Sequence, residues 1–193
     1  MICYALCGSF CTMSRSLEQL EKLAAEGYSL LPVFSFNASS IDTRFGRAEE
    51  MVKKAESLCG RQAVLTIEGA EPIGPKLCPE MFVIAPCTGN TLAKLANGIT
   101  DTPVTMAAKS HLRNGRPLVI AVATNDALSA NLKSIATLLE KKNVYFVPMA
   151  QDDPIKKPHS MIADFSRIGE AVLAAWGGTQ LQPIFLPSGS VTL

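Results

Sequence analysis

The chain has 193 residues, of which 18 are basic and 17 are acidic, so its formal net charge is +1. That length is typical of one domain, and it suffices to bury an apolar core without disulfide or metal staples. A charge near zero excludes the basic surface that nucleic acid or an anionic membrane would need. Charged residues make up only 18%, against about 25% in an average soluble domain. A surface so poor in charge predicts that neighbouring subunits of a homo-oligomer cover part of it.

Simple counts exclude several other kinds of segment and site. No apolar run approaches the ~18 residues that a membrane span needs. Met1 leads straight into an apolar segment, without the basic region and cleavage site of a signal peptide. We therefore expect a cytoplasmic protein with no membrane partner. The six cysteines form no C-x-x-C pair, and the two histidines, His111 and His159, stand far apart, so we expect no disulfide and no metal site.

Short apolar runs alternate with segments of helical periodicity. This predicts one doubly wound, three-layer α/β/α domain over residues 1–178, Rossmann-like, with a mainly parallel six-stranded sheet. In chain order, the predicted strands cover residues 2–7, 28–35, 63–67, 81–85, 118–123 and 144–147. The predicted helices cover residues 14–26, 48–59, 91–96, 104–112 and 132–142, and a last helix carries Ile162, Phe165, Ile168 and Val172 on one stripe. Residues 36–46 are expected to form a polar loop, and residues 179–193 an arm or a disordered tail.

Glycine and polar residues collect in the loops that follow the predicted strands. In an open α/β sheet, ligands bind beyond the carboxyl ends of the strands, where the strand order reverses. With the order 3-2-1-4-5-6, residues 7–12 and 85–91 would face each other across that point. Residues 35–37 and 123–127 end at the same edge of the sheet. The sequence therefore predicts a binding site at this edge.

Both facing loops contain glycine and hydroxyl groups, and both open a helix, whose free N–H groups favour an anion. Neither loop contains G-x-G-x-x-G or G-x-x-x-x-G-K-[ST], which disfavours a dinucleotide of the NAD type and a P-loop nucleotide. A mononucleotide phosphate held by hydroxyls and backbone fits better, and this favours FMN. The alternative is that Ser9, Thr12 and Thr88 only cap the helices that they precede.

For other polar residues, an ordinary structural role is also an alternative to a functional one. Arg44 lies beside an aromatic residue in a loop, where it would contact a substrate carboxylate or form a surface ion pair. Asn125 and Asp126 would form a simple turn. The pairs at residues 152–153 and 156–157 are expected to form a solvated loop.

The run APCTGNTLAKLANGITD at residues 85–101 resembles the signature of the homo-oligomeric flavin-containing decarboxylase superfamily. That superfamily includes flavin prenyltransferases and phosphopantothenoylcysteine decarboxylases. The Gly8-Ser9 turn and Ser35 also fall where its members contact FMN. The resemblance implies a homo-oligomer, either a trimer or a dodecamer of trimers. The matching residues are Pro86, Thr88, Asn90, Thr91, Ala96, Gly98 and Asp101.

A second resemblance covers nearly the whole chain. It is carried by TRFG (43–46), GAEPIGPK (69–76), LRNG (112–115), TNDALS (124–129) and NVYFVPMAQDDPIKKPHSM (143–161), which are similar to the family of dipicolinate synthase B subunits. The resemblance implies an oxidoreductase subunit that acts with an NAD(P)-binding A subunit. Together they would convert a dihydrodipicolinate-type precursor into dipicolinate (pyridine-2,6-dicarboxylate) in the mother cell of a sporulating bacterium.

The chain also departs from the wider superfamily. It lacks the catalytic histidine that cysteine-type decarboxylases carry after the third strand, and Thr124-Asn125-Asp126 stands where flavin prenyltransferases carry an arginine. A stand-alone decarboxylase or prenyltransferase is therefore a less favoured alternative function. A second alternative is that the chain is a non-catalytic scaffold for the A subunit.

The loops and the resemblance together give the candidate site residues. We expect Asn90 and Asn125 to hold the flavin ring or the substrate, and Arg44 to bind a carboxylate of the small dicarboxylate substrate, so that these three are the catalytic candidates. Lys109, Lys156 and Lys157 are further basic candidates. The residues expected to bind the cofactor are Gly8, Ser9, Thr12, Ser35, Cys87, Thr88, Gly89, Asn90, Thr91 and Thr124.

Overall fold

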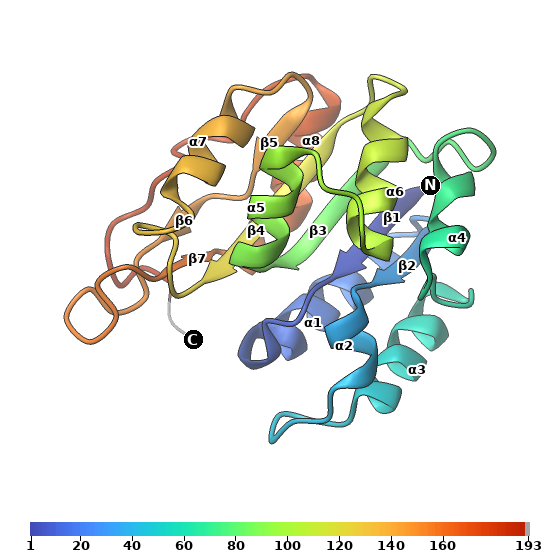
Figure 1. Ribbon diagram of the computed structural model, residues 1–193, viewed down its shortest axis with the longest axis horizontal. Helices are drawn as coiled ribbons and strands as arrows, with labels where there is room; N and C mark the ends of the chain where they lie inside the picture. The colour runs from blue at the N-terminus through green and yellow to red at the C-terminus, as the bar shows by residue number, and fades with distance from the viewer. Residues whose placement is uncertain (192–193) are drawn as a thin grey trace.

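A seven-stranded sheet forms the centre of residues 1–191, which are the residues that the structure, a computed structural model, describes (Figure 1). Its parallel part has the order β2-β1-β3-β4-β5, and β7 and β6 continue antiparallel from the end of β4. The strands are β1 (Ile2–Leu6), β2 (Leu30–Phe34), β3 (Met81–Cys87), β4 (Leu118–Thr124), β5 (Val144–Phe146), β6 (Met149–Ala150) and β7 (Met161–Ala163).

Helices cover both faces of this sheet (Figure 1), so the predicted doubly wound architecture is confirmed. Helices α1, α3 and α8 pack on one face, and α4, α5, α6 and α7 lie on the other. None of the helices in residues 1–191 has the length and apolar character that crossing a membrane requires. The helices are α1 (Met13–Ala25), α2 (Phe36–Ser40), α3 (Ala48–Cys59), α4 (Ile67–Ala70), α5 (Gly89–Asn97), α6 (Pro103–Leu112), α7 (Leu132–Leu139) and α8 (Ile168–Trp176), with 3-10 turns η1 (Phe10–Thr12), η2 (Glu71–Ile73) and η3 (Phe165–Arg167).

The central strands are apolar along their whole length because both of their faces are covered. Every residue of β1 and of β3 is buried, and their side chains pack against helices on each side. The long helices instead bury a single stripe; in α1 this stripe includes Leu17, Leu20 and Leu23. The core is therefore continuous through all three layers.

The strand predicted at residues 63–67 is wrong. Only Val64 pairs there, through a single bridge to Val33 of β2. The chain then turns into α4, because the Thr66 hydroxyl accepts a hydrogen bond from the N–H of Gly69 and so begins a helix. The predicted strand order 3-2-1-4-5-6 nevertheless holds, with this bridge in the position of the third strand.

The last predicted helix begins later than its apolar stripe suggested. Ile162 lies in β7 and pairs with Ala123, and α8 begins only at Ile168. The carboxylate of Asp164 accepts a hydrogen bond from the N–H of Ser166 and so starts a 3-10 turn between strand and helix. Two further differences are the short strands β6 and β7, which were not predicted, and α2, which forms inside the expected loop at residues 36–46.

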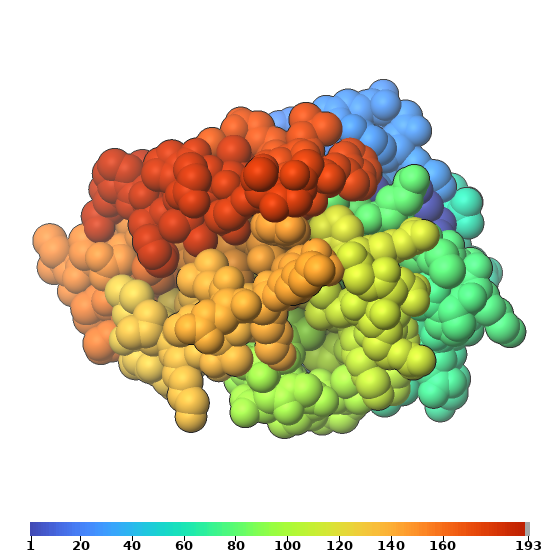
Figure 2. Space-filling view, turned by 90° about the horizontal axis from the view of Figure 1, so that it is seen from above, coloured from blue at the N-terminus to red at the C-terminus, as the bar shows by residue number. Residues whose placement is uncertain are grey.

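Residues 179–191 run back along the edge of the sheet as an arm. Met149 of β6 bonds on both sides to this arm, donating to the carbonyl of Ile184 and accepting from the N–H of Leu186, each at 2.9 Å. In Figure 2 the C-terminal segment lies alongside the orange residues that contain β5 and β6. The last two residues of the expected arm or tail, 192–193, lie outside the described residues.

Candidate functional site

The parallel register brings the ends of neighbouring strands to one edge of the sheet. Leu6 of β1 pairs with Phe34 of β2, and Ala5 pairs with Ile84 of β3. The chain segments that follow these strands therefore leave the sheet side by side. The loop after β1 and the loop after β3 meet across the predicted reversal of strand order, as the sequence led us to expect.

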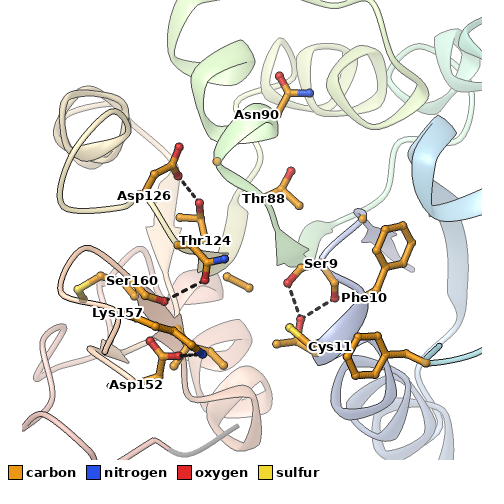
Figure 3. Close-up of a pocket in the computed structure, with 18 of the residues that line it drawn as sticks. Ser9, Phe10, Cys11, Thr88, Asn90, Thr124, Asp126, Asp152, Lys157 and Ser160 are labelled. Atoms are coloured by element: carbon orange, nitrogen blue, oxygen red, sulfur yellow. Dashed lines mark hydrogen bonds and ion pairs between the residues drawn. The ribbon is translucent and has the colours of Figure 1, made fainter. Parts of the chain in front are cut away.

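These segments surround a cavity of about 720 Å³ (Figure 3). One side is formed by the turn after β1 and the first turn of α5, and the facing side by the loop between β6 and β7. The volume lies within the range of roughly 300–1,000 Å³ that is typical of small-molecule sites. Of the expected site residues, those that line the cavity are Gly8, Ser9, Thr12, Arg44, Thr88, Gly89, Asn90, Thr124 and Asn125.

Three expected cofactor residues lie behind this lining. Ser35 caps α2, because its hydroxyl accepts a hydrogen bond from the N–H of Ala38. Cys87 is fully buried, and burial raises the pKa of its thiol well above the usual value. Thr91 turns inward and donates from Oγ1 to Sγ of Cys7 at 3.4 Å. The structure thus places these three residues as supports of the cavity.

The turn after β1 is shaped to leave its backbone accessible. Thr12 Oγ1 donates to the carbonyl oxygen of Ser9 at 2.9 Å, which holds the turn closed. A Cβ added to Gly8 would lie 3.3 Å from Cβ of Asn37 and 3.4 Å from the ring of Phe10. Glycine therefore keeps open the space between this turn and α2, where an anionic group could approach the backbone.

The first turn of α5 forms the adjoining wall. Thr88 caps the helix by accepting from the N–H of Thr91 at 3.4 Å, so the N–H groups of Gly89 and Asn90 have no acceptor within the helix. These N–H groups lie at the positive end of the helix dipole. The wall therefore offers hydrogen-bond donors and a favourable potential to a phosphate or to the polar edge of a ring.

Gly89 also packs against a polar network below α5. Asp126 Oδ1 accepts hydrogen bonds from Thr124 Oγ1 and from Asn131 Nδ2, the latter at 3.0 Å. A Cβ on Gly89 would lie 2.5 Å from Asn131 Nδ2 and 2.7 Å from both Asp126 Oδ1 and Thr124 Oγ1. Asp126 is therefore more than part of a turn, because it ties the end of β4 to the start of α7 at the place where Gly89 of α5 packs against them.

The facing side contains an ion pair, with a buried carboxylate and a partly exposed ammonium, in the segment that was expected to be a solvated loop. Only 5% of the Asp152 side chain is exposed, and its Oδ2 lies 3.0 Å from Nζ of Lys157. Among residues 1–191, Asp152 Oδ1 finds no hydrogen-bond donor. Ser160 Oγ donates to Oδ1 of Asn125 at 3.4 Å, next to the pair (Figure 3). The expectation of a solvated loop holds for Lys156, which is exposed, but not for the side chain of Asp152, because β6 and β7, too short at two and three residues to show a strand period, hold this end of the loop against the cavity.

Both charges of this pair are maintained at neutral pH. Burial by itself raises the pKa of Asp152, but the nearby hydroxyl of Ser160 and the ammonium of Lys157 outweigh it and hold that pKa below its usual value. Hydrogen bonding to Asp152 raises the pKa of Lys157 in turn. The facing side therefore presents a carboxylate and an ammonium together.

The remaining basic candidates divide into two groups. Arg44 lines the cavity, and its guanidinium carbon lies 4.8 Å from the ring centroid of Phe45. Lys109 and Lys156 are exposed and do not contribute to the cavity lining. Two other lining residues were not among the expected site residues: Cys11 belongs to no recognisable motif, and Phe45 lies within the TRFG segment but was considered only as the neighbour of Arg44.

These residues fit a flavin mononucleotide. Glycine turns, hydroxyl groups and unpaired helix N–H groups suit a phosphate and a ribityl chain, and the apolar side chains of Met161 and Ile162 add area for a ring. A metal site has no such support: in the described part of the chain, no three or more His, Cys, Asp or Glu side chains are grouped so that they could hold an ion.

Comparison with known proteins agrees with this geometry. Residues 1–177 match the family model described as flavoprotein. The chain is 47% identical over 183 residues to the B subunit of dipicolinate synthase from Bacillus subtilis (strain 168), covering 95% of this chain and 92% of that one.

Solved structures give the same result. The crystal structure of the dipicolinate synthase B subunit from Bacillus halodurans C matches with a TM-score of 0.89 at 40% identity, covering 97% of this chain and 96% of that one. The FMN-dependent cysteine decarboxylase SpaF matches with a TM-score of 0.66 at 24% identity, over 90% and 95% of the two chains, so it shares the fold. The chain therefore belongs to the flavoprotein family, as a homologue of the B subunit of dipicolinate synthase.

Proposed function

We propose that this chain binds FMN in the cavity and serves as the B subunit of a dipicolinate-forming oxidoreductase. One observation carries the cofactor assignment: two glycine-containing turns with hydroxyl groups, at the ends of β1 and β3, wall the same cavity of about 720 Å³. Membership of the flavoprotein family and the shared fold with an FMN-dependent enzyme support it.

In this proposal the chain's residues divide the work of binding. The turn from Gly8 to Thr12 and the first turn of α5 hold the phosphate and ribityl groups, with Ser35, Cys87 and Thr91 supporting them from behind. Asn90 and Asn125 contact the flavin ring or the substrate, and Arg44 binds a substrate carboxylate.

FMN, when bound, would accept the two electrons that leave a dihydrodipicolinate-type ring as it becomes aromatic. The protein's own contribution is orientation and exclusion of water. Asn90 and Asn125 would fix the ring in the cavity, and Arg44 would anchor a carboxylate of the dianionic substrate at its mouth.

We further propose that the chain acts with an NAD(P)-binding A subunit, in the cytoplasm of the mother cell of a sporulating bacterium. The chain itself would assemble as a homo-oligomer, a trimer or a dodecamer of trimers. Large apolar side chains on its surface are consistent with such assembly: Ile155 is 90% exposed, Leu173 is 60% exposed and Phe185 is 57% exposed.

The test is an absorbance titration of the purified chain with FMN, followed by mixing with an A-type subunit and precursor under anaerobic conditions. We expect a shifted flavin spectrum on binding, and loss of the flavin absorbance only when the A subunit and precursor are both present. Activity of the chain alone in decarboxylation or prenyl transfer would contradict the proposed role. Full dipicolinate formation with no flavin bound would reduce the chain to a scaffold.

A further inference from the structure

The carboxylate of Asp126 presents one oxygen to the cavity. Its Oδ1 is already used, because it accepts hydrogen bonds from Thr124 Oγ1 and from Asn131 Nδ2. Its Oδ2 has no donor among residues 1–191, and it does not belong to the side-chain atoms there that are both buried and without a partner. Asp126 is partly exposed and lines the cavity. A molecule in the cavity can therefore reach this oxygen.

The charge of Asp126 is not balanced by a neighbouring cation. Two carboxylates line the cavity, and Asp152 is paired with Lys157 at 3.0 Å, whereas Asp126 has no ion-pair partner in the described part of the chain. Figure 3 shows both carboxylates across the cavity from Ser9. A phosphate is therefore favoured on the side of Ser9, and the side of Asp126 suits a neutral group that donates a hydrogen bond.

Hydrogen-bond donors lie on either side of Asp126. Asn125 precedes it in the chain and has its Oδ1 engaged by Ser160, which leaves its Nδ2 donors available. Asn90 follows Gly89, against which Asp126 packs, and its exposed side chain makes no hydrogen bond within residues 1–191. Figure 3 shows Asn90 and Asp126 at the end of the cavity away from Cys11. The three side chains therefore offer an acceptor between two donors.

We propose that Asn125, Asp126 and Asn90 recognise a cyclic imide, which is a ring N–H between two carbonyl groups. Asp126 Oδ2 accepts a hydrogen bond from the imide N–H, and the two asparagine amides donate to the carbonyl oxygens that flank it. The pyrimidine ring of a flavin carries such an imide. The inference thus deepens the proposed function, and it rests on that function for the identity of the ligand as FMN.

This recognition also fixes the direction in which the flavin lies. With the imide at Asp126, the phosphate reaches the turn at Ser9, where no carboxylate lines the cavity. A flavin bound in the opposite direction would place its phosphate beside the unpaired carboxylate, and repulsion between like charges disfavours that orientation. Asp126 therefore selects the orientation as well as the ring.

Titration of the intact chain with three flavins tests the proposal, with flavin fluorescence and calorimetry as the readouts. In 3-methyl-FMN a methyl group replaces the imide hydrogen, whereas 5-deaza-FMN keeps the imide and changes the centre of the ring. We expect FMN and 5-deaza-FMN to bind with similar affinity, and 3-methyl-FMN to bind about tenfold more weakly or worse. Equal affinity for FMN and 3-methyl-FMN would overturn the proposal.

Asp126→Asn assigns this preference to a residue. The new Oδ1 still accepts from Thr124 and Asn131, but an amide N–H replaces Oδ2 and faces the imide donor to donor. We expect FMN to bind about tenfold more weakly and the preference over 3-methyl-FMN to disappear. Asp153→Asn is the control: it removes a charge outside the cavity lining, so both properties should be retained.

Other results with Asp126→Asn would contradict the assignment. A purely structural role of Asp126 would weaken FMN and 3-methyl-FMN by the same factor, and exclusion of the methyl group by other residues would leave the preference intact. If the variant does not fold, Asn125→Ala replaces it, because Asn125 is exposed. Asn125→Ala should weaken FMN severalfold, and unchanged FMN affinity in that variant would count against the proposal.

The reduction potential gives a separate readout. Asp126→Asn removes a negative charge beside the ring that gains electrons, so the reduction potential of bound FMN should rise. Asp153→Asn should leave the potential unchanged. An equal potential in both variants and the wild-type chain would contradict contact between Asp126 and the flavin.

The outcomes separate this inference from the proposed function. FMN binding and dipicolinate formation with the A subunit, but equal affinity for FMN and 3-methyl-FMN, would reject the inference alone. An Asp126-dependent preference for FMN without dipicolinate formation in the mixture would reject the proposed role in that reaction alone. Absence of FMN binding to the wild-type chain would reject both.

Discussion

Thr91 Oγ1 donates a hydrogen bond to Sγ of Cys7 across 3.4 Å, which joins the first turn of α5 directly to the end of β1. Both residues are buried. Burial raises the pKa of the Cys7 thiol to about 11, so this sulfur stays neutral at physiological pH and acts here as an acceptor. The contact holds together the two turns between which the phosphate is proposed to bind.

Replacing Thr91 by valine should loosen this junction. Thr91→Val keeps the shape but removes the hydroxyl, so we expect a loss of about 1 kcal/mol in the free energy of unfolding and weaker FMN binding. The control is Thr137→Val on α7, where the hydroxyl bonds the carbonyl of Lys133 at the surface. Denaturant unfolding and flavin titration measure both effects; equal behaviour of the two variants would contradict the role of Thr91.

A methyl group on Gly89 should disturb the cavity wall. Its Cβ would lie within 2.7 Å of the side chains of Thr124, Asp126 and Asn131. We expect Gly89→Ala to destabilise the fold by about 1–3 kcal/mol and to weaken FMN binding. Gly169→Ala on α8 is the matched control, because nothing lies within 4 Å of the added Cβ. Comparable unfolding midpoints for the two variants would show that the close approach of Gly89 is unimportant.

Loss of Arg44 should affect the substrate more than the cofactor. In the mixture with an A subunit, Arg44→Ala is expected to raise KM for the dicarboxylate substrate severalfold and to leave FMN affinity intact. Arg47→Ala serves as the control, since Arg47 faces Asp42 and Glu49 at 3.9 Å and lies outside the cavity lining. Loss of FMN binding together with activity would instead assign Arg44 a role in folding.

Cys11 should report occupancy of the cavity. Cys11 and Cys78 are both exposed, but only Cys11 lines the cavity. FMN is therefore expected to slow alkylation of Cys11 by iodoacetamide and to leave the rate at Cys78 unchanged. Peptide mass spectrometry measures the two rates in one sample. Equal protection of both thiols, or of neither, would argue against binding in this cavity.

His111 should make the fold sensitive to mild acid. Its Nε2 bonds the carbonyl of Pro117 at 2.8 Å, its Nδ1 has no partner in residues 1–191, and burial lowers its pKa from 6.5 to about 4. Below pH 6.5 the unfolded chain takes up a proton that the folded chain does not. The free energy of unfolding should therefore fall by up to about 3 kcal/mol between pH 6.5 and pH 4.

The measurement is the pH profile of urea unfolding for the wild-type chain and for His111→Gln. The variant lacks this titration, so its profile should be flatter over the same interval. Parallel profiles would mean that His111 does not link protonation to stability.

The sequence predicts the architecture well because β1, β3 and β4 are continuous apolar runs and the helices have clear stripes and ends. α3, for example, begins and ends at the predicted residues, and Gly60 at its end has a φ of 61° that suits glycine. The turns after β1 and β3 face each other because these strands are parallel neighbours in the sheet, which the strand order alone predicts.

The facing side of the cavity could not be predicted in the same way. β6 and β7 are held by pairing with β4, with each other and with the arm, and two or three residues carry no periodic signal. Asp152 looks like part of a solvated loop until this tertiary pairing places it against the cavity. Two helix caps show the same limit. Thr66 begins α4 in a segment whose apolar pattern favoured a strand, and Asp164 begins a 3-10 turn in a segment whose apolar stripe favoured one continuous helix.

The arm at residues 179–191 acts as a clasp on the side of the cavity that is formed by the loop between β6 and β7. The Gln180 side chain bonds both the N–H and the carbonyl of Phe146, and the N–H of Gly189 bonds the carbonyl of Gln151, next to Asp152. Releasing the clasp would bare the hydrogen-bonding edge of β6 and free one end of the loop that carries Asp152 and Lys157. The placement of Asp152 and Lys157 in the cavity wall thus depends on residues outside the cavity lining, and a truncation from Gln180 onward would be expected to loosen this wall.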